Sequence, residues 1–479
     1  MLYRQMSKLK KYVTAIFTAS TLLYSIASHA IPTDAQDDIN LLIESVDQQH
    51  QLFSTHFQKF LSTQSQLSSP KYKKISPLLL QVKKHVSKNE NVLAANIIFN
   101  NITTLNENYD NNDIFYIISI LLNQNDTKTA NAIFDLIKNE GDQTLISNTA
   151  YIFSTFSFKR NQWDKTLQLL NGIINELPDE NHYHALLMQG ISLQKIKKHR
   201  ESIKHYEKIK PTSKYYLSAR LNMAIANIRQ GWWTDAHIII RETLKSAEAL
   251  DQEEALNRLY LTLGYSLMNQ EYYRDSRNYF RNISIDSIFT NRALLGITLT
   301  AANQNDFVGA LSTAHILKDK QTYELPVEES YLLMPYFYEK LKQSTTASAG
   351  YLEAINYYQK RIADIQSIID SEINLERHPI NININTTLKI NNTPINLSHE
   401  YPSYFFENYL KLKLYEKYLK SSGNKNIQTE YDQLHNGYKT IIVKIIRRIL
   451  KKRIDHLNSY MSQSKFGLAG LYDINQTDD

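Results

Sequence analysis

The same types of residue return at the same offsets in three successive segments within residues 183–283, and each segment has the apolar spacing of a helix. Every segment has a small residue, an aromatic or bulky residue near an expected turn, a second small residue three positions later, and a large residue four positions after that. The three sets are Gly190, His199, Ser202 and Tyr206; Ala224, Trp233, Ala236 and Ile240; and Gly264, Tyr273, Ser276 and Phe280. Small residues let two helices approach closely, so the pattern predicts a stack of helical hairpins.

This pattern resembles the tetratricopeptide repeat, a helical hairpin of 34 residues. The second small residue can be followed along the chain at Ala95, Ala130, Thr166, Ser202, Ala236, Ser276, Ala310 and Ala354. The successive spacings are 35, 36, 36, 34, 40, 34 and 44 residues. The resemblance implies an all-α fold, a right-handed α-solenoid of about eight such hairpins over residues 76–360.

The first thirty residues have the features of a secretory signal. Lys8, Lys10 and Lys11 precede an apolar run over residues 12–26, and Ser28 and Ala30 place small residues before a cleavage position. We expect residues 1–30 to be a signal peptide cleaved after Ala30, and the protein to be periplasmic. An uncleaved anchor is the alternative, although the run is shorter than the ~20 residues that span a bilayer. Residues 31–75 then read as helices that cap the first hairpin.

Composition argues against several classes of protein. The net charge is +6, but four basic residues lie in the first thirty positions, which leaves 50 basic and 48 acidic residues elsewhere. This balance does not predict a nucleic-acid partner. The chain has no cysteine, which excludes disulfides and thiol nucleophiles, and we expect no cofactor and no metal.

No catalytic residues are expected. His399 and Glu400 are followed by Pro402 and have no second histidine four residues on, so they cannot form the zinc site of a helical metallopeptidase. Residues 464–471 faintly resemble the substrate-groove signature of lytic transglycosylases, but the residues before them include no catalytic glutamate. An enzyme or a peptidoglycan-associated factor with activity in the C-terminal region remains the alternative function.

The helical period disappears over residues 361–400, an Asn-rich connector. Ile380, Ile382 and Ile384 alternate with asparagines, which leaves two interpretations open, a short hairpin or a loop. Residues 401–479 are again helical, with a long amphipathic helix from about residue 428. Its basic side carries Lys444, Arg447, Arg448, Lys451 and Lys452. This patch is either a solvated face or a contact for an acidic partner, anionic lipid, a cell-wall polymer or a second copy. Peripheral membrane contact is not predicted.

The resemblance also places a groove on the inner face of the array. Its residues, carried over from the positions that bind partners in the family, are Leu187, Ile191, Leu221, Ile225, Ile228, Arg229, Leu261, Tyr265 and Met268. The strip is apolar, and a carboxylate clamp is not expected because leucine occupies the fifth place of each repeat. Its occupant is a partner's peptide or helix, or the protein's own C-terminal helix, unless these residues are ordinary core. We expect a non-catalytic scaffold or adaptor that binds another envelope protein or peptide.

Overall fold

The computed structural model of the protein describes residues 34–64, 70–249, 252–320, 322–382, 386–419 and 424–477. The expected signal peptide, with its cleavage position after Ala30, lies outside these residues. Regular structure in the described residues is almost entirely helical, and two short strands form their one sheet. The predicted all-α fold is therefore confirmed. None of the described helices is both long and apolar enough to cross a membrane.

The described part of the chain contains eight consecutive helical hairpins. They pair α3 (Ile75–Ser87) with α4 (Asn91–Asn100), α6 (Ile114–Asn123) with α7 (Thr127–Glu140), α8 (Gln143–Lys159) with α9 (Trp163–Leu170), α10 (Asp179–Lys195) with α11 (His199–Tyr206), α12 (Tyr216–Arg229) with α13 (Trp233–Ala249), α14 (Glu253–Asn269) with α15 (Tyr273–Arg281), α16 (Thr290–Asn303) with α17 (Phe307–Asp319), and α18 (Leu325–Lys340) with α19 (Ser344–Asp370). The short α5 (Ile102–Asn106) and η1 (Ile174–Glu176) lie between hairpins. Each hairpin packs on the next, so the predicted α-solenoid is confirmed.

The turn inside every hairpin has the same backbone geometry. One residue adopts positive φ, and the N–H of the residue after it donates to the carbonyl five positions back, for example from Lys198 to Leu193 at 2.8 Å. This is a Schellman motif, which satisfies the last carbonyls of the first helix. The eight residues at positive φ are Asn89, Asn125, Asn161, Lys197, Gly231, Glu271, Asn305 and Lys342. Four are asparagines, which tolerate this conformation better than most residues.

These turns correct the register of the first and last hairpins. The small residue of the second helix follows the turn residue by five positions, which gives Ala94 in place of Ala95 and Ala347 in place of Ala354. The repeat spacing measured between turn residues is 36, 36, 36, 34, 40, 34 and 37. Ala354 matches the pattern of the small residue because it lies seven residues, about two helical turns, after Ala347. Both alanines are buried on the same side of the long α19.

Close approach between helices explains the glycines of the repeat. A Cβ atom on Gly190 would lie 2.3 Å from the ring of Tyr206, and one on Gly264 would lie 2.6 Å from the ring of Phe280. Phe280 is enclosed from the other side by Gly296, where a Cβ would lie 2.5 Å from the ring. A large ring is therefore buried between successive hairpins only because glycine leaves room for it.

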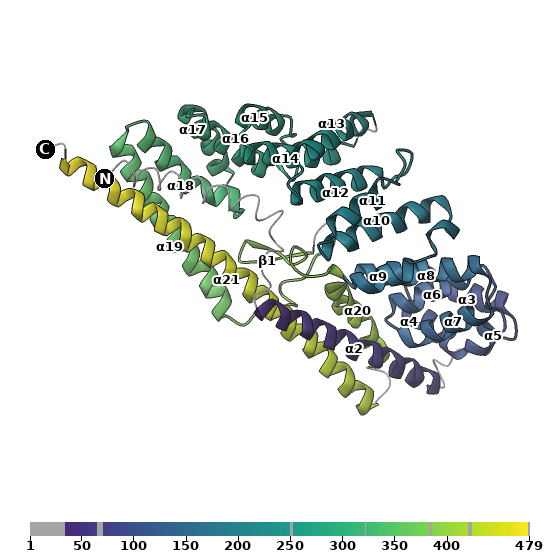
Figure 1. Ribbon diagram of the computed structural model, residues 1–479. Coiled ribbons are helices and arrows are strands. Elements are labelled where there is room, and N and C mark those ends of the chain that lie inside the picture. Colours follow the sequence, from purple (N-terminus) through teal and green to yellow (C-terminus); the bar gives the residue numbers. More distant parts are fainter. Residues whose placement is uncertain are drawn as a thin grey trace.

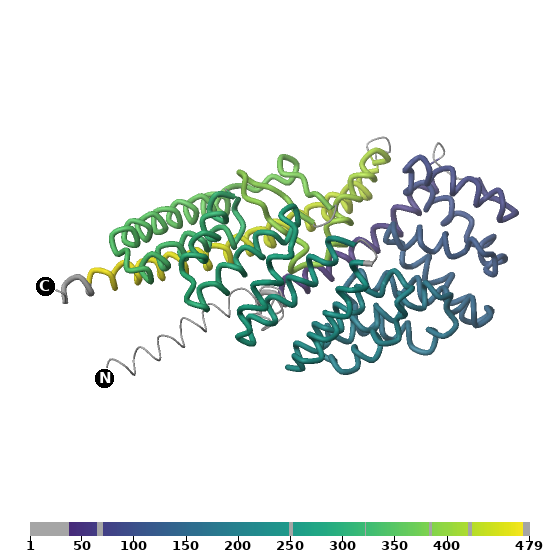
Figure 2. Tube along the Cα trace, turned by 90° about the horizontal axis from the view of Figure 1, so that it is seen from above, coloured from purple at the N-terminus to yellow at the C-terminus, as the bar shows by residue number. Residues whose placement is uncertain are grey.

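Three further helices join the two ends of the array. They are α2 (Asp34–Thr63), α20 (Ser403–Leu419) and α21 (Lys425–Thr477). The hairpins form an arc, and α21 runs along its open side (Figure 1). It packs most extensively on α19 at the end of the array and on α2, which in turn contacts α4 and α7 at its beginning. Figure 2 shows α2 beside α21 from a second direction. One hydrophobic core accordingly contains residues from both ends of the chain, among them Phe57, Tyr358 and Tyr438.

The connector contains a β-hairpin. Strands β1 (Thr387–Ile390) and β2 (Thr393–Asn396) pair with Ile390 opposite Thr393. Asn391 and Asn392 both have positive φ, as a two-residue type I′ turn requires. The hairpin thus lies after the alternating isoleucines. Of that alternating segment, Asn381 makes an isolated bridge to Thr387, and Ile384 lies outside the described residues.

Candidate functional site: the inner face and the junctions of the arc

The predicted groove residues lie on the first helices of three neighbouring hairpins, α10, α12 and α14. Six of them are buried, namely Leu187, Leu221, Ile228, Leu261, Tyr265 and Met268. Ile191, Ile225 and Arg229 are half-buried. The buried members pack within and between hairpins. Tyr265, for example, contacts Phe280 of its own hairpin and donates its hydroxyl to the carbonyl of Arg292, in the next hairpin, at 2.8 Å. The expectation of a continuous apolar groove is therefore wrong. The first helices of neighbouring hairpins lie side by side and cover most of the predicted groove residues.

The C-terminal helix, one of the two occupants considered for the predicted groove, does not lie in that groove. Instead of filling the strip on α10, α12 and α14, α21 packs along α19 and α2 and also touches α18, α20 and β2. Near its end, Gly467 lies against Tyr351, and a Cβ there would be 2.4 Å from the ring. Tyr351 has the place in α19 that Phe280 has in α15, so α21 stands where the next hairpin would begin.

Cationic side chains give the inner face its chemical character. Arg229 ends α12, and within the described residues it has neither an ion pair nor a hydrogen bond. Partial burial lowers the pKa of its guanidinium. Lys195 has the equivalent place in α10, where burial, and then the charge of Arg229, lower the pKa of its ammonium group. A partly desolvated cation beside another cation favours an anionic group of a ligand.

Most cations of the predicted basic patch are used inside the molecule. Arg447 donates to the carbonyls of Ile369 and Ser371, at 3.2 and 3.4 Å, where α19 ends. Lys452 lies 2.7 Å from Glu400. Arg453, next to the patch, pairs with the buried Glu328.

Arg448 is half-buried near Tyr401, and only Lys444 and Lys451 of the patch are exposed. The patch is therefore neither a free cationic surface nor a fully solvated face. Its charges hold α21 on the end of the array, and Lys452 pairs with Glu400, which follows His399 in the rejected zinc motif.

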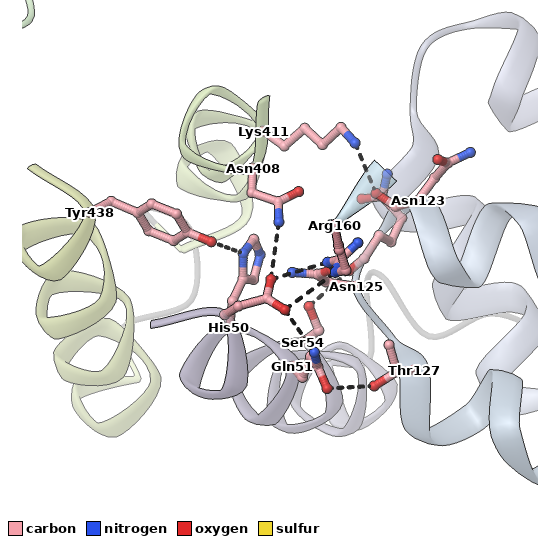
Figure 3. A network of polar contacts seen from close by, with 12 residues as sticks. His50, Gln51, Ser54, Asn123, Asn125, Thr127, Arg160, Asn408, Lys411 and Tyr438 are labelled. Atoms are coloured by element: carbon pink, nitrogen blue, oxygen red, sulfur yellow. Dashed lines mark hydrogen bonds and ion pairs between the residues drawn. The ribbon is translucent and has the colours of Figure 1, made fainter. Parts of the chain in front are cut away.

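A buried polar network joins α2, the turns that follow α6 and α8, α20 and α21 (Figure 3). Its centre is the ion pair between Asp47 and Arg160, at 3.1 Å, with both side chains almost fully buried. Arg160 also donates to the amide oxygen of Asn125, and Asn408 of α20 donates to Asp47 at 3.4 Å. A buried ion pair with its remaining bonding capacity satisfied is costly to break, so the network fixes how these elements meet.

His50 extends this network to α21. Its ring nitrogen is 2.9 Å from the hydroxyl of Tyr438. Burial, followed by the charges of Arg160 and Lys411, lowers the pKa of His50 to about 3, so the ring is neutral at ordinary pH. The sequence offered one overlooked signal: His50 stands on the apolar face of α2, four residues after Val46 and three before Phe53.

A second buried junction holds α21 against α18. The hydroxyl of Tyr460 donates to Glu329 at 3.2 Å, and burial raises the pKa of Glu329 to about 7. The neighbouring Glu328 pairs with Arg361 of α19 at 3.5 Å and with Arg453 of α21. The described residues contain no group of three side chains able to hold a metal ion. The contacts of both junctions join α21 to other helices of the molecule.

The hairpin geometry decides the type of array. Each hairpin has the same turn, a small residue five positions later and, in α7, α11, α15 and α19, a buried ring four positions after that. The array is tetratricopeptide-like.

The solved structures that align with this chain do so at low similarity. No protein-family model and no curated protein matches the sequence. Among solved structures, PilW, described as a type IV pilus biogenesis factor, aligns with a TM-score of 0.35 and 18% identity over 46% of this chain and 99% of its own. A tetratricopeptide repeat protein from Parabacteroides merdae aligns with a TM-score of 0.35 and 13% identity, over 54% of this chain and 97% of its own. The apo form of RapI aligns with a TM-score of 0.42 and 13% identity, over 78% of this chain and 98% of its own.

Proposed function

We propose that this protein is a non-catalytic scaffold of the bacterial cell envelope that holds another protein against the inner face of hairpins α10 to α15. The observation that carries the proposal is Arg229, a half-buried cation with no acidic partner in the described residues. Removing such a group from water is unfavourable, and an ion pair with a carboxylate of a ligand would offset that free-energy cost. Ile191 and Ile225 provide half-buried apolar surface on the same face.

The closed arc supports a binding role. Because α21 joins the last hairpin to α2, the curvature of the inner face is held at both ends. A surface that is ordered before binding loses less entropy when a partner arrives, which favours affinity. The envelope location rests on the sequence features of residues 1–30, and we propose export to the periplasm on that basis.

A photoreactive residue at position 225 tests the proposal in an envelope extract. We expect one envelope protein to crosslink there, and the Arg229→Glu substitution to weaken that crosslink at least about tenfold by reversing the charge that attracts the partner. Position 316 on α17, where Ile316 is exposed, is the matched control. Equal labelling at both positions, or crosslinking only within the protein, would contradict the proposal.

A further inference from the structure

A small cavity lies between the last two hairpins of the array, at the end of the arc opposite α3 (Figure 1). Its walls come from α17, α18 and α19, and its lining shares no residue with the predicted groove. The volume is about 270 Å³. Sites for small molecules commonly measure about 300–1,000 Å³, so this cavity has the size for a single small ring.

The base of the cavity is apolar. Met334 and Pro335 of α18 line it and are buried. Opposite them, α19 contributes Ala349 and Gly350. A Cβ atom on Gly350 would lie 3.0 Å from the Cβ of Pro335, so the two helices approach closely at this point. The space beside the contact stays open because alanine and glycine have almost no side chain to fill it.

Pro335 also leaves a backbone acceptor at the cavity. Proline has no N–H, so the carbonyl of Tyr331 lacks the donor that an α-helix normally supplies four residues later. Tyr331 and Pro335 both line the cavity, and this carbonyl therefore lies on the face of α18 that borders it. A hydroxyl or amide of a ligand could provide the missing hydrogen bond.

Polar side chains form the rest of the lining. Lys318 and Glu353 make an ion pair at 2.6 Å, and the ring of His315 lies 3.3 Å from the hydroxyl of Tyr338. The charges of Lys318 and Glu353 cancel, yet each group can form further hydrogen bonds, since an ammonium group has three N–H donors and a carboxylate has about four acceptor sites. The lining thus offers both donors and acceptors.

The wall formed by Tyr331 is held in place from both sides. Its ring stacks on that of Tyr357, with the ring centres 3.8 Å apart and the planes at 7°. The ammonium group of Lys318 lies 4.9 Å from the ring centre of Tyr331. A wall that is ordered before binding reduces the entropy lost when a ligand arrives.

We propose that this cavity binds one ring of a neutral sugar. A pyranose ring presents C–H groups on its faces and hydroxyls around its edge, which matches an apolar base bordered by polar groups. Each hydroxyl both donates and accepts, so the ligand can bond to Lys318, to Glu353 and to the Tyr331 carbonyl while the ion pair stays intact.

Other ligand classes fit this lining less well. An ionic ligand would compete with the pair of Lys318 and Glu353, and an apolar ring would leave the polar groups without partners, which costs free energy. The cavity lies outside hairpins α10 to α15, so this inference does not depend on the function proposed above.

Saturation-transfer NMR with the purified chain tests the inference. The probes are glucose, galactose and N-acetylglucosamine, and glucuronate is the reference because it has the same ring with a carboxylate. We expect ring C–H protons of a neutral sugar to receive saturation from the protein, and glucuronate to bind at least about threefold more weakly.

Two substitutions on α19 locate the binding. Ala349→Phe places a ring in the cavity, and we expect affinity for the sugar to fall at least about tenfold. Ala363→Phe is the matched control, because Ala363 is also exposed on α19 and does not line the cavity; its effect should be less than about twofold. Glu353→Gln adds no bulk and weakens one acceptor, so affinity should fall at least about threefold.

Absence of saturation transfer to all three neutral sugars would overturn the inference. So would equal binding of glucuronate, which would remove the preference for an uncharged ring. Binding that survives Ala349→Phe, or that falls equally with Ala363→Phe, would place the sugar elsewhere. Crosslinking at position 225 should be unchanged by Ala349→Phe, which separates this test from that of the proposed function.

Discussion

His50 and Glu329 lie where α21 meets other parts of the chain, and the stability that each contributes changes with pH in the opposite direction. Burial lowers the pKa of His50 to about 3, so its contribution to stability is present above pH 6.5 and is lost as pH falls toward 3. Burial raises the pKa of Glu329 from 4.5 to about 7, so its contribution is present below pH 4.5 and is lost as pH rises through 7. The attachment of α21 should therefore be strongest in mildly acidic solution.

The Glu329→Gln substitution isolates one side of this pH dependence. Glutamine keeps the shape of the protonated carboxyl and cannot ionise, so the variant should gain stability relative to the parent as pH rises. The difference in free energy of unfolding should be about 3 kcal/mol larger at pH 8 than at pH 4.5. Urea unfolding over this pH range measures it. The exposed Glu372→Gln is the control, and a pH-independent difference at position 329 would disprove the assignment.

At the scale of helices, α21 takes over the role of a missing ninth hairpin. In the array the ring of Phe280 is enclosed by Gly264 and by Gly296 of the following hairpin. The equivalent ring in the last hairpin, Tyr351, is enclosed by Gly467 of α21. A solenoid needs a cap because its last hairpin cannot cover its own apolar face, and here the cap belongs to a helix of 53 residues that reaches back to α2.

Two glycines of α21 test this role. Gly467→Ala should destabilise the protein by about 1–3 kcal/mol, because the methyl group collides with Tyr351. Gly470→Ala should be neutral or stabilise by up to about 1 kcal/mol, because it meets nothing within 4 Å and alanine favours a helix. Thermal unfolding of the two variants provides the measurement. Similar shifts in melting temperature would mean that α21 does not pack on the last hairpin as described.

At the scale of the whole molecule, the array is closed through contacts between residues hundreds of positions apart. Open solenoids are stabilised by neighbouring repeats alone, so a local defect stays local. Here Phe57 of α2 and Tyr415 of α20 meet with their ring centres 4.8 Å apart, in the core that also contains α19 and α21. The first and last parts of the chain should therefore open together.

Hydrogen exchange can detect this coupling. Phe57→Ala removes a fully buried ring at the closure and should cost about 3–5 kcal/mol. It should lower the protection of amides in α19 and α21 as well as in α2. Phe280→Ala removes an equally buried ring in the middle of the array, and its effect should centre on α14 to α16. Unchanged protection of α19 in the Phe57 variant would show that the two ends open independently.

The repeat itself was accessible from the sequence because it depends on neighbours in the chain. Gly190 and Tyr206, or Gly264 and Phe280, are sixteen residues apart, and their spacing is set by the length of one hairpin. The register failed at Ala354 because a long helix offers the same small and aromatic residues again after two turns. The nature of the connector remained open because short strands and polar loops share a composition rich in asparagine.

The sequence by itself determined the helices, the turns between them and the stacking of one hairpin on the next, since all three depend on residues close together in the chain. Only the tertiary structure decided which faces are covered. The strip from Leu187 to Met268 is mostly core because neighbouring helices close over it. Arg447, Lys452 and Arg453 hold α21 in place, whereas Lys444 and Lys451 of the same helix are exposed. A side chain's periodicity shows that it shares a face with others, but burial and pairing depend on distant segments whose positions are fixed only when the arc closes.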